Sequence, residues 1–244
     1  MTTLTAETSP LVRARLAGFW YLLANLFAPI TLLYLPARFI VRGDAAATAS
    51  NIMASESLFR LGVGLSLFTF IAQIFLALVL YQLLNVVNKN MAALMVIFAL
   101  MAVPIAMLNE LNQLAAVLLL SGADYLKAFT AAQLQALVYA FLRLHGQGLN
   151  IAQIFWGLWL FPMGYLVFKS GFLPRVLGLL LIVAGFGYVI QSFASLLWPS
   201  LQVDLIFVTG WGELFFLLWL LIKGVNVDQW NKRALESARS SAFG

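Results

Sequence analysis

The sequence contains no cysteine and a single histidine, and these two shortages exclude several kinds of chemistry. Without cysteine there is no disulfide, no thiolate nucleophile and no cysteine-bound metal. One histidine cannot build the histidine-rich metal clusters of membrane desaturases and hydroxylases, nor a bis-histidine haem site. We therefore expect no metal site and no cofactor, and the sequence points to no catalytic residue.

Charge is scarce as well, and hydrophobic residues take its place. Only 9% of the residues are charged and 63% are hydrophobic, whereas about a quarter of the residues of a soluble domain carry charge. Several apolar runs exceed about eighteen residues, the length that crosses roughly 30 Å of hydrocarbon as a helix. In lipid, helices satisfy their own backbone hydrogen bonds. The composition predicts an all-α, polytopic integral membrane bundle whose partner is the lipid bilayer.

The net charge of +5 does not indicate a nucleic-acid partner. The 14 Lys and Arg residues stand singly or in pairs at the ends of apolar runs. At such places they reach the lipid headgroups and set the orientation of the protein. Since no basic tract is present to follow a phosphate backbone, we expect no binding to nucleic acid.

The apolar runs predict one transmembrane domain over residues 15–225. Residues 1–14 form an N-terminal tail, and residues 226–244 form a basic cytoplasmic tail that we expect to be disordered. An Ala-, Ser- and Thr-rich loop, residues 37–57, follows the first span. The predicted spans cover residues 15–36, 58–87, 91–120, 151–168, 176–197 and 203–222.

The segment 125–145 allows two interpretations. Its most apolar part, residues 128–144, is at the lower limit of spanning length. If the segment lies on the surface or is re-entrant, there are six spans and both termini share a side; if it crosses, there are seven. Both alternatives place the C-terminus in the cytoplasm, because four basic residues follow the last span. We favour six spans plus a surface or re-entrant helix, since the basic turns at 88–90 and 169–175 then lie inside.

Two acids inside the predicted spans motivate the functional hypotheses. Glu110 stands in the stretch "AMLNELNQLAAV", with Asn109 and Gln113 on the same flank of the helix. Glu213 lies in the middle of the last span. An intramembrane carboxylate is costly unless it is protonated, paired or hydrated, so we expect both to face protein or water. Because no basic residue is predicted at their depth, we expect neutral acids, or acids that share a site with each other or with a bound cation.

Other spans carry polar residues near their centres, among them Asn25 in the first span and Gln73 in the second. These residues either link helices by hydrogen bonds or face a common polar cavity. His145 lies beside a glycine break at a predicted membrane edge, for which we favour a capping or interfacial role. The candidate ligand-binding residues are Asn25, Gln73, Asn109, Glu110, Gln113 and Glu213.

Three functions are compatible with this pattern. The first is binding or transport of a small molecule, lipid or ion in a mid-membrane polar cavity. The second is a non-catalytic sensor or partner subunit whose polar stripes only hold the helices together. The third is an intramembrane lipid-modifying enzyme that uses Glu110 or Glu213 as a general acid or base. We favour the first, because polar residues recur along most of the spans and no nucleophile–base pair is recognisable.

Several runs together resemble the domain-of-unknown-function family 4386. The resemblance covers about residues 15–225 and implies a multi-span protein of the bacterial inner membrane. It implies no activity, substrate or catalytic residue. The runs that carry it include "RLAGFWYLL" (15–23), "LNELNQLA" (108–115), "SGFLPRVLGLLLIVAGFGYVIQSF" (170–193) and "GELFFLLWLLIKG" (212–224).

Overall fold

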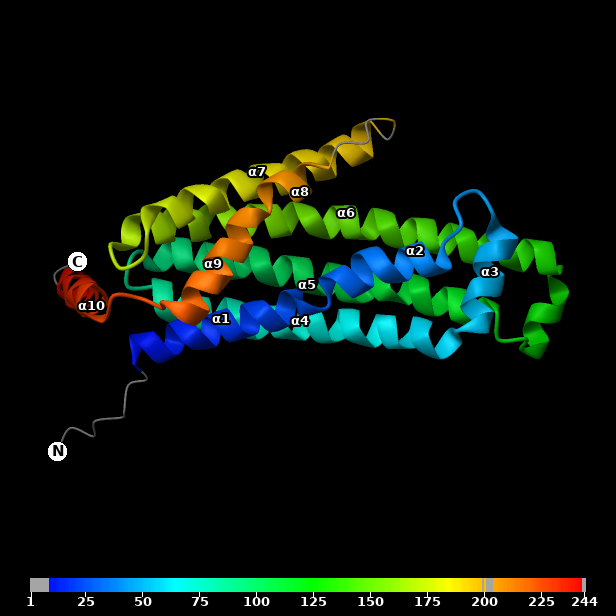
Figure 1. Cartoon of the computed structure of the whole chain (residues 1–244), viewed down its shortest axis with the longest axis horizontal. Helices are drawn as coiled ribbons and strands as arrows, with labels where there is room; N and C mark the ends of the chain where they lie inside the picture. Colours follow the sequence, from blue (N-terminus) through cyan, green and yellow to red (C-terminus); the bar gives the residue numbers. More distant parts are fainter. Residues whose placement is uncertain (1–8, 199, 201–203, 243–244) are drawn as a thin grey trace.

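The computed structural model of the chain is a bundle of long helices, described for residues 9–198, 200 and 204–242 (Figure 1). The prediction of an all-α membrane bundle is confirmed. The elements are α1 (Pro10–Leu26), the π-helical turn η1 (Pro29–Tyr34), α2 (Leu35–Phe39), α3 (Ala45–Ala54), α4 (Glu56–Leu84), α5 (Lys89–Leu119), the 3₁₀ turn η2 (Asp124–Ala128), α6 (Ala131–Ser170), α7 (Arg175–Leu197), α8 (Leu205–Thr209), α9 (Trp211–Ile222) and α10 (Val227–Ala242).

Six helical segments of the described chain are long and apolar enough to cross a membrane, so the protein contacts the lipid bilayer. Contact with lipid on most sides explains why many large apolar side chains are exposed, such as Val183 and Ile190 on α7. The six segments are Pro10–Phe39, Glu56–Leu84, Lys89–Leu119, Ala131–Ser170, Arg175–Leu197 and Leu205–Ile222.

The predicted number of six spans is confirmed, but the segment 125–145 forms neither a separate surface or re-entrant helix nor a seventh span. Most of it is the first part of α6, which continues without a break for 40 residues. Thr130 and Gln133 form a capping box at its start, and Gly171, with φ +76°, ends it. A helix of this length is about 60 Å long, twice the thickness of the hydrocarbon, so α6 extends well beyond it.

Three other predicted boundaries differ from the structure. The helix α1 begins at Pro10, so residues 10–14 are helical, and residues 1–8 of the predicted tail lie outside the described residues. Ten of the 21 residues of the predicted loop 37–57 form helix α3, capped by the Asp44 side chain. The last span is broken at Gly210 into α8 and α9, and positions 201–203 are not described.

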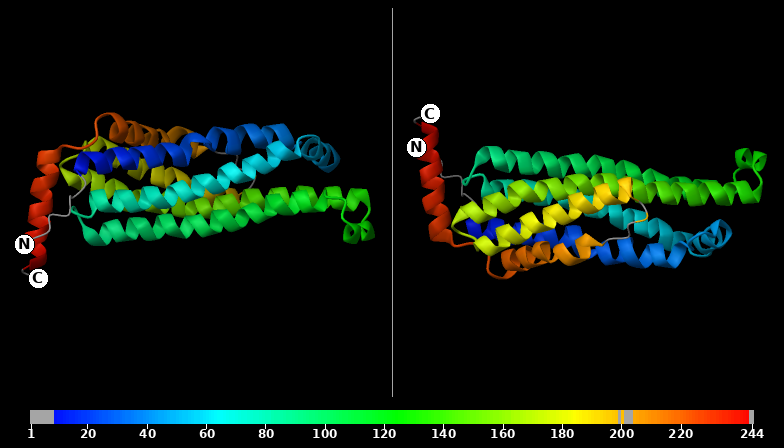
Figure 2. Two further views of the ribbon diagram at one scale, coloured as in Figure 1. Left: turned by 90° about the horizontal axis from the view of Figure 1, so that it is seen from below. Right: turned by 90° about the horizontal axis from the view of Figure 1, so that it is seen from above.

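The predicted disordered tail is also wrong, because residues 227–242 form α10, which lies across one end of the bundle (Figure 2). Trp230 holds α10 in place. Its side chain is buried, its Nε1 donates to the Leu83 carbonyl oxygen at 2.9 Å, and the Arg13 guanidinium lies 5.6 Å from its ring centroid. The charged composition of this segment predicted disorder, because it gave no indication that Trp230 packs against the bundle. Residues 243–244 lie outside the described residues.

The bundle has two distinct ends. We call the end with α10 and Pro10 the near end, and the end with α3 and η2 the far end (Figures 1 and 2). The helices α4, α5 and α6 reach further toward the far end than α7 does (Figure 1). The near half is filled by an apolar core that includes Leu80, Leu83, Met163 and Leu220.

Candidate functional site

A cavity with about 950 Å³ of empty space, its open mouth included, lies beyond the near-end core. Side chains from α1, α4, α5, α6, α7 and α9 line it. Four of the six candidate residues lie on its wall: Asn25, Gln73, Glu110 and Glu213. The set of candidate residues left out other polar and aromatic members of the wall. These are Tyr21, Thr31, Ser66, Thr69, Phe70, His145, Gln153, Trp156, Trp159 and Tyr188.

Glu213 lies in the first turn of α9, inside the last candidate span. It is nine residues before Ile222, the last residue of α9, or about 14 Å along the helix. The buried Tyr21 of α1 donates from its hydroxyl to Glu213 Oε2 at 2.5 Å, and the Tyr188 hydroxyl of α7 lies beside the same carboxyl group. Within the described chain, no Lys, Arg or His side chain forms an ion pair with Glu213.

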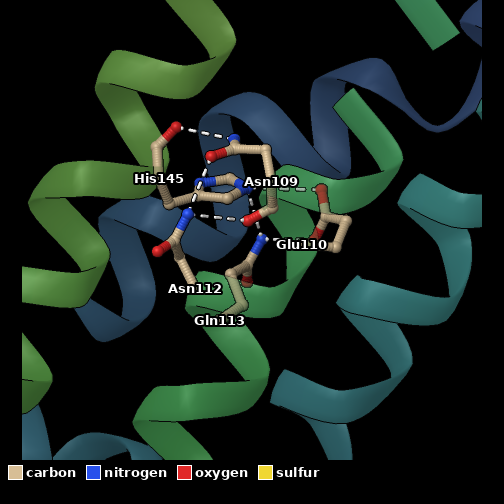
Figure 3. A network of polar contacts seen from close by, with 5 residues as sticks. All are labelled: Asn109, Glu110, Asn112, Gln113 and His145. Atoms are coloured by element: carbon tan, nitrogen blue, oxygen red, sulfur yellow. Dashed lines mark hydrogen bonds and ion pairs between the residues drawn. The ribbon is translucent and has the colours of Figure 1, made fainter. Parts of the chain in front are cut away.

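Glu110 has different surroundings, because it is buried between α5 and α6 in a network of polar side chains (Figure 3). His145 Nε2 lies 3.2 Å from Glu110 Oε1, and Gln113 Nε2 donates to Glu110 Oε2 at 2.9 Å. Asn109 Nδ2 donates to the His145 carbonyl oxygen at 2.8 Å. The expectation that Glu110 has no basic partner is wrong, because the continuous helix α6 brings His145 beside α5.

The direction of the hydrogen bonds in this network depends on the tautomer of His145. His145 Nε2 faces both Glu110 Oε1 and Gln113 Nε2, which lies 3.0 Å away. If Nε2 carries a proton, it donates to Glu110; if it does not, it accepts from the Gln113 amide, and the Glu110 carboxyl must supply the proton between them. In both states each carboxyl oxygen of Glu110 has a neighbour. The network therefore fixes Glu110 in place at the cavity wall.

The two acids line the same cavity at different depths. Glu110 is 21 residues along α5 from Lys89, or about 32 Å from the near end. Glu213 lies much closer to the near end. Asn109 and Gln113 support Glu110 instead of lining this cavity, although Gln113 and His145 line a second, adjoining cavity toward the far end.

The mouth of the cavity lies in the side wall of the bundle, beside the break between α1 and η1. Asn25 and Leu32 both line the cavity and are exposed, so the cavity reaches the molecular surface there. Pro29 has no N–H, and the chain widens into a π-helical turn at this point. Asn25 donates to the Tyr21 carbonyl oxygen of its own helix at 3.0 Å. It belongs to the rim of the site.

The α4 and α6 walls carry polar groups that the protein only partly satisfies. Gln73 Oε1 accepts from Trp156 Nε1 at 3.1 Å, and the Trp156 ring stacks on Phe70. Thr69 Oγ1 and Gln153 Oε1 are buried, yet neither finds a hydrogen-bond partner among the described residues. Such groups are costly in an apolar interior. Both atoms are therefore available to a water molecule or a ligand in the cavity.

Comparison with known proteins agrees with the family resemblance found in the sequence. The family model "Domain of unknown function (DUF4386)" matches residues 16–224. An uncharacterized protein of Archaeoglobus fulgidus is 38% identical over 81 residues, which are 33% of this chain and 49% of that protein; the chain thus spans about half the length of this relative. No solved structure matches the chain. Because the family model covers most of its length, the chain belongs to the DUF4386 family.

Proposed function

We propose that the chain binds a small polar molecule inside the membrane, in the cavity between Glu213 and Glu110. The observation that supports this most strongly is the convergence of polar side chains on one space, including two polar atoms without a hydrogen-bond partner among the described residues. If the polar stripes served only to hold helices together, Thr69 and Gln153 would be paired with neighbouring helices. Their free oxygens favour a ligand site.

The cavity supports binding more than open conduction. Leu76 lines the cavity and also belongs to the near-end core, which continues through Leu80, Leu83 and Met163. These side chains are nearly or completely buried, so the cavity ends on close-packed apolar residues. Passage of a polar solute to the near end requires this core to part. In this conformation the site is a pocket that the near-end core closes on one side.

A cavity-filling variant tests the proposed function. The probes are 4-fluorophenethylammonium, 4-fluorophenethyl alcohol and 4-fluorophenylacetate, observed by ¹⁹F NMR with the full chain in lipid nanodiscs. We expect saturable binding of at least one probe to the wild type and of none to Thr69→Trp, whose indole would occupy the cavity. Leu78→Trp, on an exposed face of the same helix, is the matched control and should bind as the wild type does.

Circular dichroism shows whether Thr69→Trp keeps its helices. The proposal is wrong if no probe binds to the wild type, or if each probe binds equally to wild type and to a folded Thr69→Trp variant. In the latter case the signal comes from partition into lipid.

We also propose that the near end faces the cytoplasm and that the protein lies in a bacterial inner membrane. Nine of the 14 Lys and Arg residues belong to the termini and turns of the near end, and basic residues flank spans on the cytoplasmic side. The far end contains fewer Lys and Arg residues than the near end. The orientation follows from this asymmetry.

Single-cysteine labelling tests this orientation, because the chain has no cysteine of its own. A membrane-impermeant maleimide should label Ser121→Cys and Gln147→Cys in right-side-out vesicles, and Asn90→Cys only in inside-out vesicles. All three positions are exposed, so all should react after detergent solubilisation. Labelling of Ser121→Cys and Gln147→Cys from opposite sides would contradict the six-span arrangement; the reverse pattern for all three would invert the orientation.

A further inference from the structure

We infer that the ligand of this cavity is a protonated primary or secondary organic amine, held by Glu213 among aromatic side chains. The inference rests on the proposed function and adds the class of ligand. The first observation is the charge of the cavity wall. The wall contains two acids and no Lys or Arg. Glu110 is paired with His145, whereas the known partners of Glu213, Tyr21 and Tyr188, are neutral phenols.

A charged Glu213 at this depth therefore lacks a compensating cation from the described protein. Buried charges in membrane proteins pair with one another or with bound ions. A carboxylate offers about four lone-pair sites, and the hydroxyls of Tyr21 and Tyr188 use at most two of them. Glu213 thus keeps acceptor capacity toward the cavity. An ammonium group supplies both the missing charge and the missing donors.

The aromatic side chains of the wall favour an organic cation. Tyr21, Trp156, Trp159 and Tyr188 all line the cavity with Glu213, and the Tyr21 and Trp159 rings meet edge to face at 6.1 Å. Aromatic faces attract ammonium groups, most strongly where water is excluded. They also provide apolar surface for the carbon skeleton of an amine. Such a wall offers nothing comparable to an anion.

Two free acceptors favour an amine that still carries N–H groups. Gln153 Oε1 and Thr69 Oγ1 are buried at the cavity wall and have no partner in the part of the chain that the structure describes. A primary or secondary ammonium can donate to such oxygens. A quaternary ammonium cannot. The wall therefore matches a protonated amine better than a choline-like cation.

A metal ion fits this wall less well. The described residues contain no group of three or more His, Cys, Asp or Glu side chains able to surround a metal. A calcium site takes about six to eight oxygen ligands, several of them carboxylates. Glu213 with two phenols and a distant, His-paired Glu110 does not supply that set. The geometry favours an organic cation with an apolar carbon skeleton.

The three fluorinated probes test this inference, because they share one shape and differ in charge. We expect 4-fluorophenethylammonium to bind the wild type at least about tenfold more tightly than the alcohol or the carboxylate, since a charge-assisted hydrogen bond is stronger than a neutral one. Glu213→Gln, which keeps the side-chain shape, should remove this preference and leave binding of the alcohol unchanged. Glu56→Gln, an exposed acid on α4, should keep the preference.

The failures of the two proposals are distinguishable. If the alcohol binds the wild type as tightly as the ammonium, the cavity remains a ligand site and the amine assignment is wrong. If Glu110→Gln, and not Glu213→Gln, removes the preference, the assignment to Glu213 is wrong. Absence of binding by all three probes overturns both proposals. Retained binding of the alcohol to Glu213→Gln shows that the variant is folded.

Discussion

The Gly164→Ala variant is expected to lose about 1 to 3 kcal/mol in free energy of unfolding, the usual cost of overfilling a close-packed site. A Cβ at Gly164 of α6 would lie 2.6 Å from the Gly178 carbonyl oxygen and 3.2 Å from the Ile182 backbone nitrogen of α7. These are backbone atoms, which cannot turn aside as a side-chain tip can. The two helices must therefore separate, and separation loosens their whole contact.

The contact is repeated along the two helices, which makes the expected loss large for one methyl group. A Cβ at Gly178 would lie 2.6 Å from the Gly164 carbonyl oxygen, and one at Gly185 would lie 2.9 Å from that of Gly157. Small residues at such positions let membrane helices approach closely, and much of their association comes from this packing. Tyr188 lies on α7 as well, so the spacing of the two helices also sets the width of the cavity.

Gly64→Ala is the matched control for this prediction. Gly64 lies inside α4, and no heavy atom of a neighbouring residue lies within 4 Å of a Cβ built on it. Alanine should leave the stability unchanged or raise it, because alanine favours a helix over glycine by about 1 kcal/mol. Reversible unfolding in mixed detergent micelles measures both variants. Equal stability of Gly164→Ala and Gly64→Ala would show that α6 and α7 are not in close backbone contact.

The Glu110→Ala variant is expected to lose about 3 kcal/mol in free energy of unfolding, because it removes a buried group with two hydrogen-bonding neighbours, and a buried group left unsatisfied costs about 1 to 3 kcal/mol. Glu110 is 2% exposed and receives contacts from His145 and Gln113 on its two carboxyl oxygens. Its removal leaves His145 Nε2 and the Gln113 amide without their carboxyl partner. His145→Ala removes the other half of the pair, so the double variant should cost clearly less than the sum of the two single variants.

The ion pair between Glu56 and Arg60 provides the control, because it has a shorter distance, 2.7 Å, but side chains that are about half exposed. Such pairs contribute about 0.3 to 0.5 kcal/mol on a helix, so Glu56→Ala should be nearly neutral. The same unfolding measurement compares the two acids. If the single-variant losses of Glu110→Ala and His145→Ala simply add, the two side chains are not coupled and the network does not act as a unit.

The fold class and much of the cavity wall could be predicted from the sequence, for a common physical reason. Lipid tolerates few polar groups, so each polar residue inside an apolar run carries information. Gln73, Glu110 and Glu213 could be identified in this way, and all three line one cavity. Tyr21 and Tyr188 could not be identified with the same ease, because tyrosine is equally common at membrane interfaces.

Other features depend on contacts that no local pattern reveals. In the sequence, Gly146 and Gly148 predict a break in the helix, yet α6 continues through both. The Asn109 side chain of α5 occupies the space that a Cβ at Gly148 would need. The partnership of His145 with Glu110 follows only from that continuity. Helix α10 is polar over most of its surface and depends on one tryptophan. The helix is ordered because this tryptophan, Trp230, is buried against the end of the bundle.

The side-wall position of the mouth determines the phase from which the proposed ligand arrives. Asn25 lies 15 residues along α1 from Pro10, about 22 Å from the near end and so within the thickness of the hydrocarbon. A solute there diffuses in a leaflet, and the concentration that governs occupancy is its concentration in lipid. Two amines with identical contacts to Glu213 would then differ in apparent affinity by the ratio of their partition coefficients, and bilayer composition would change the occupancy without changing the protein.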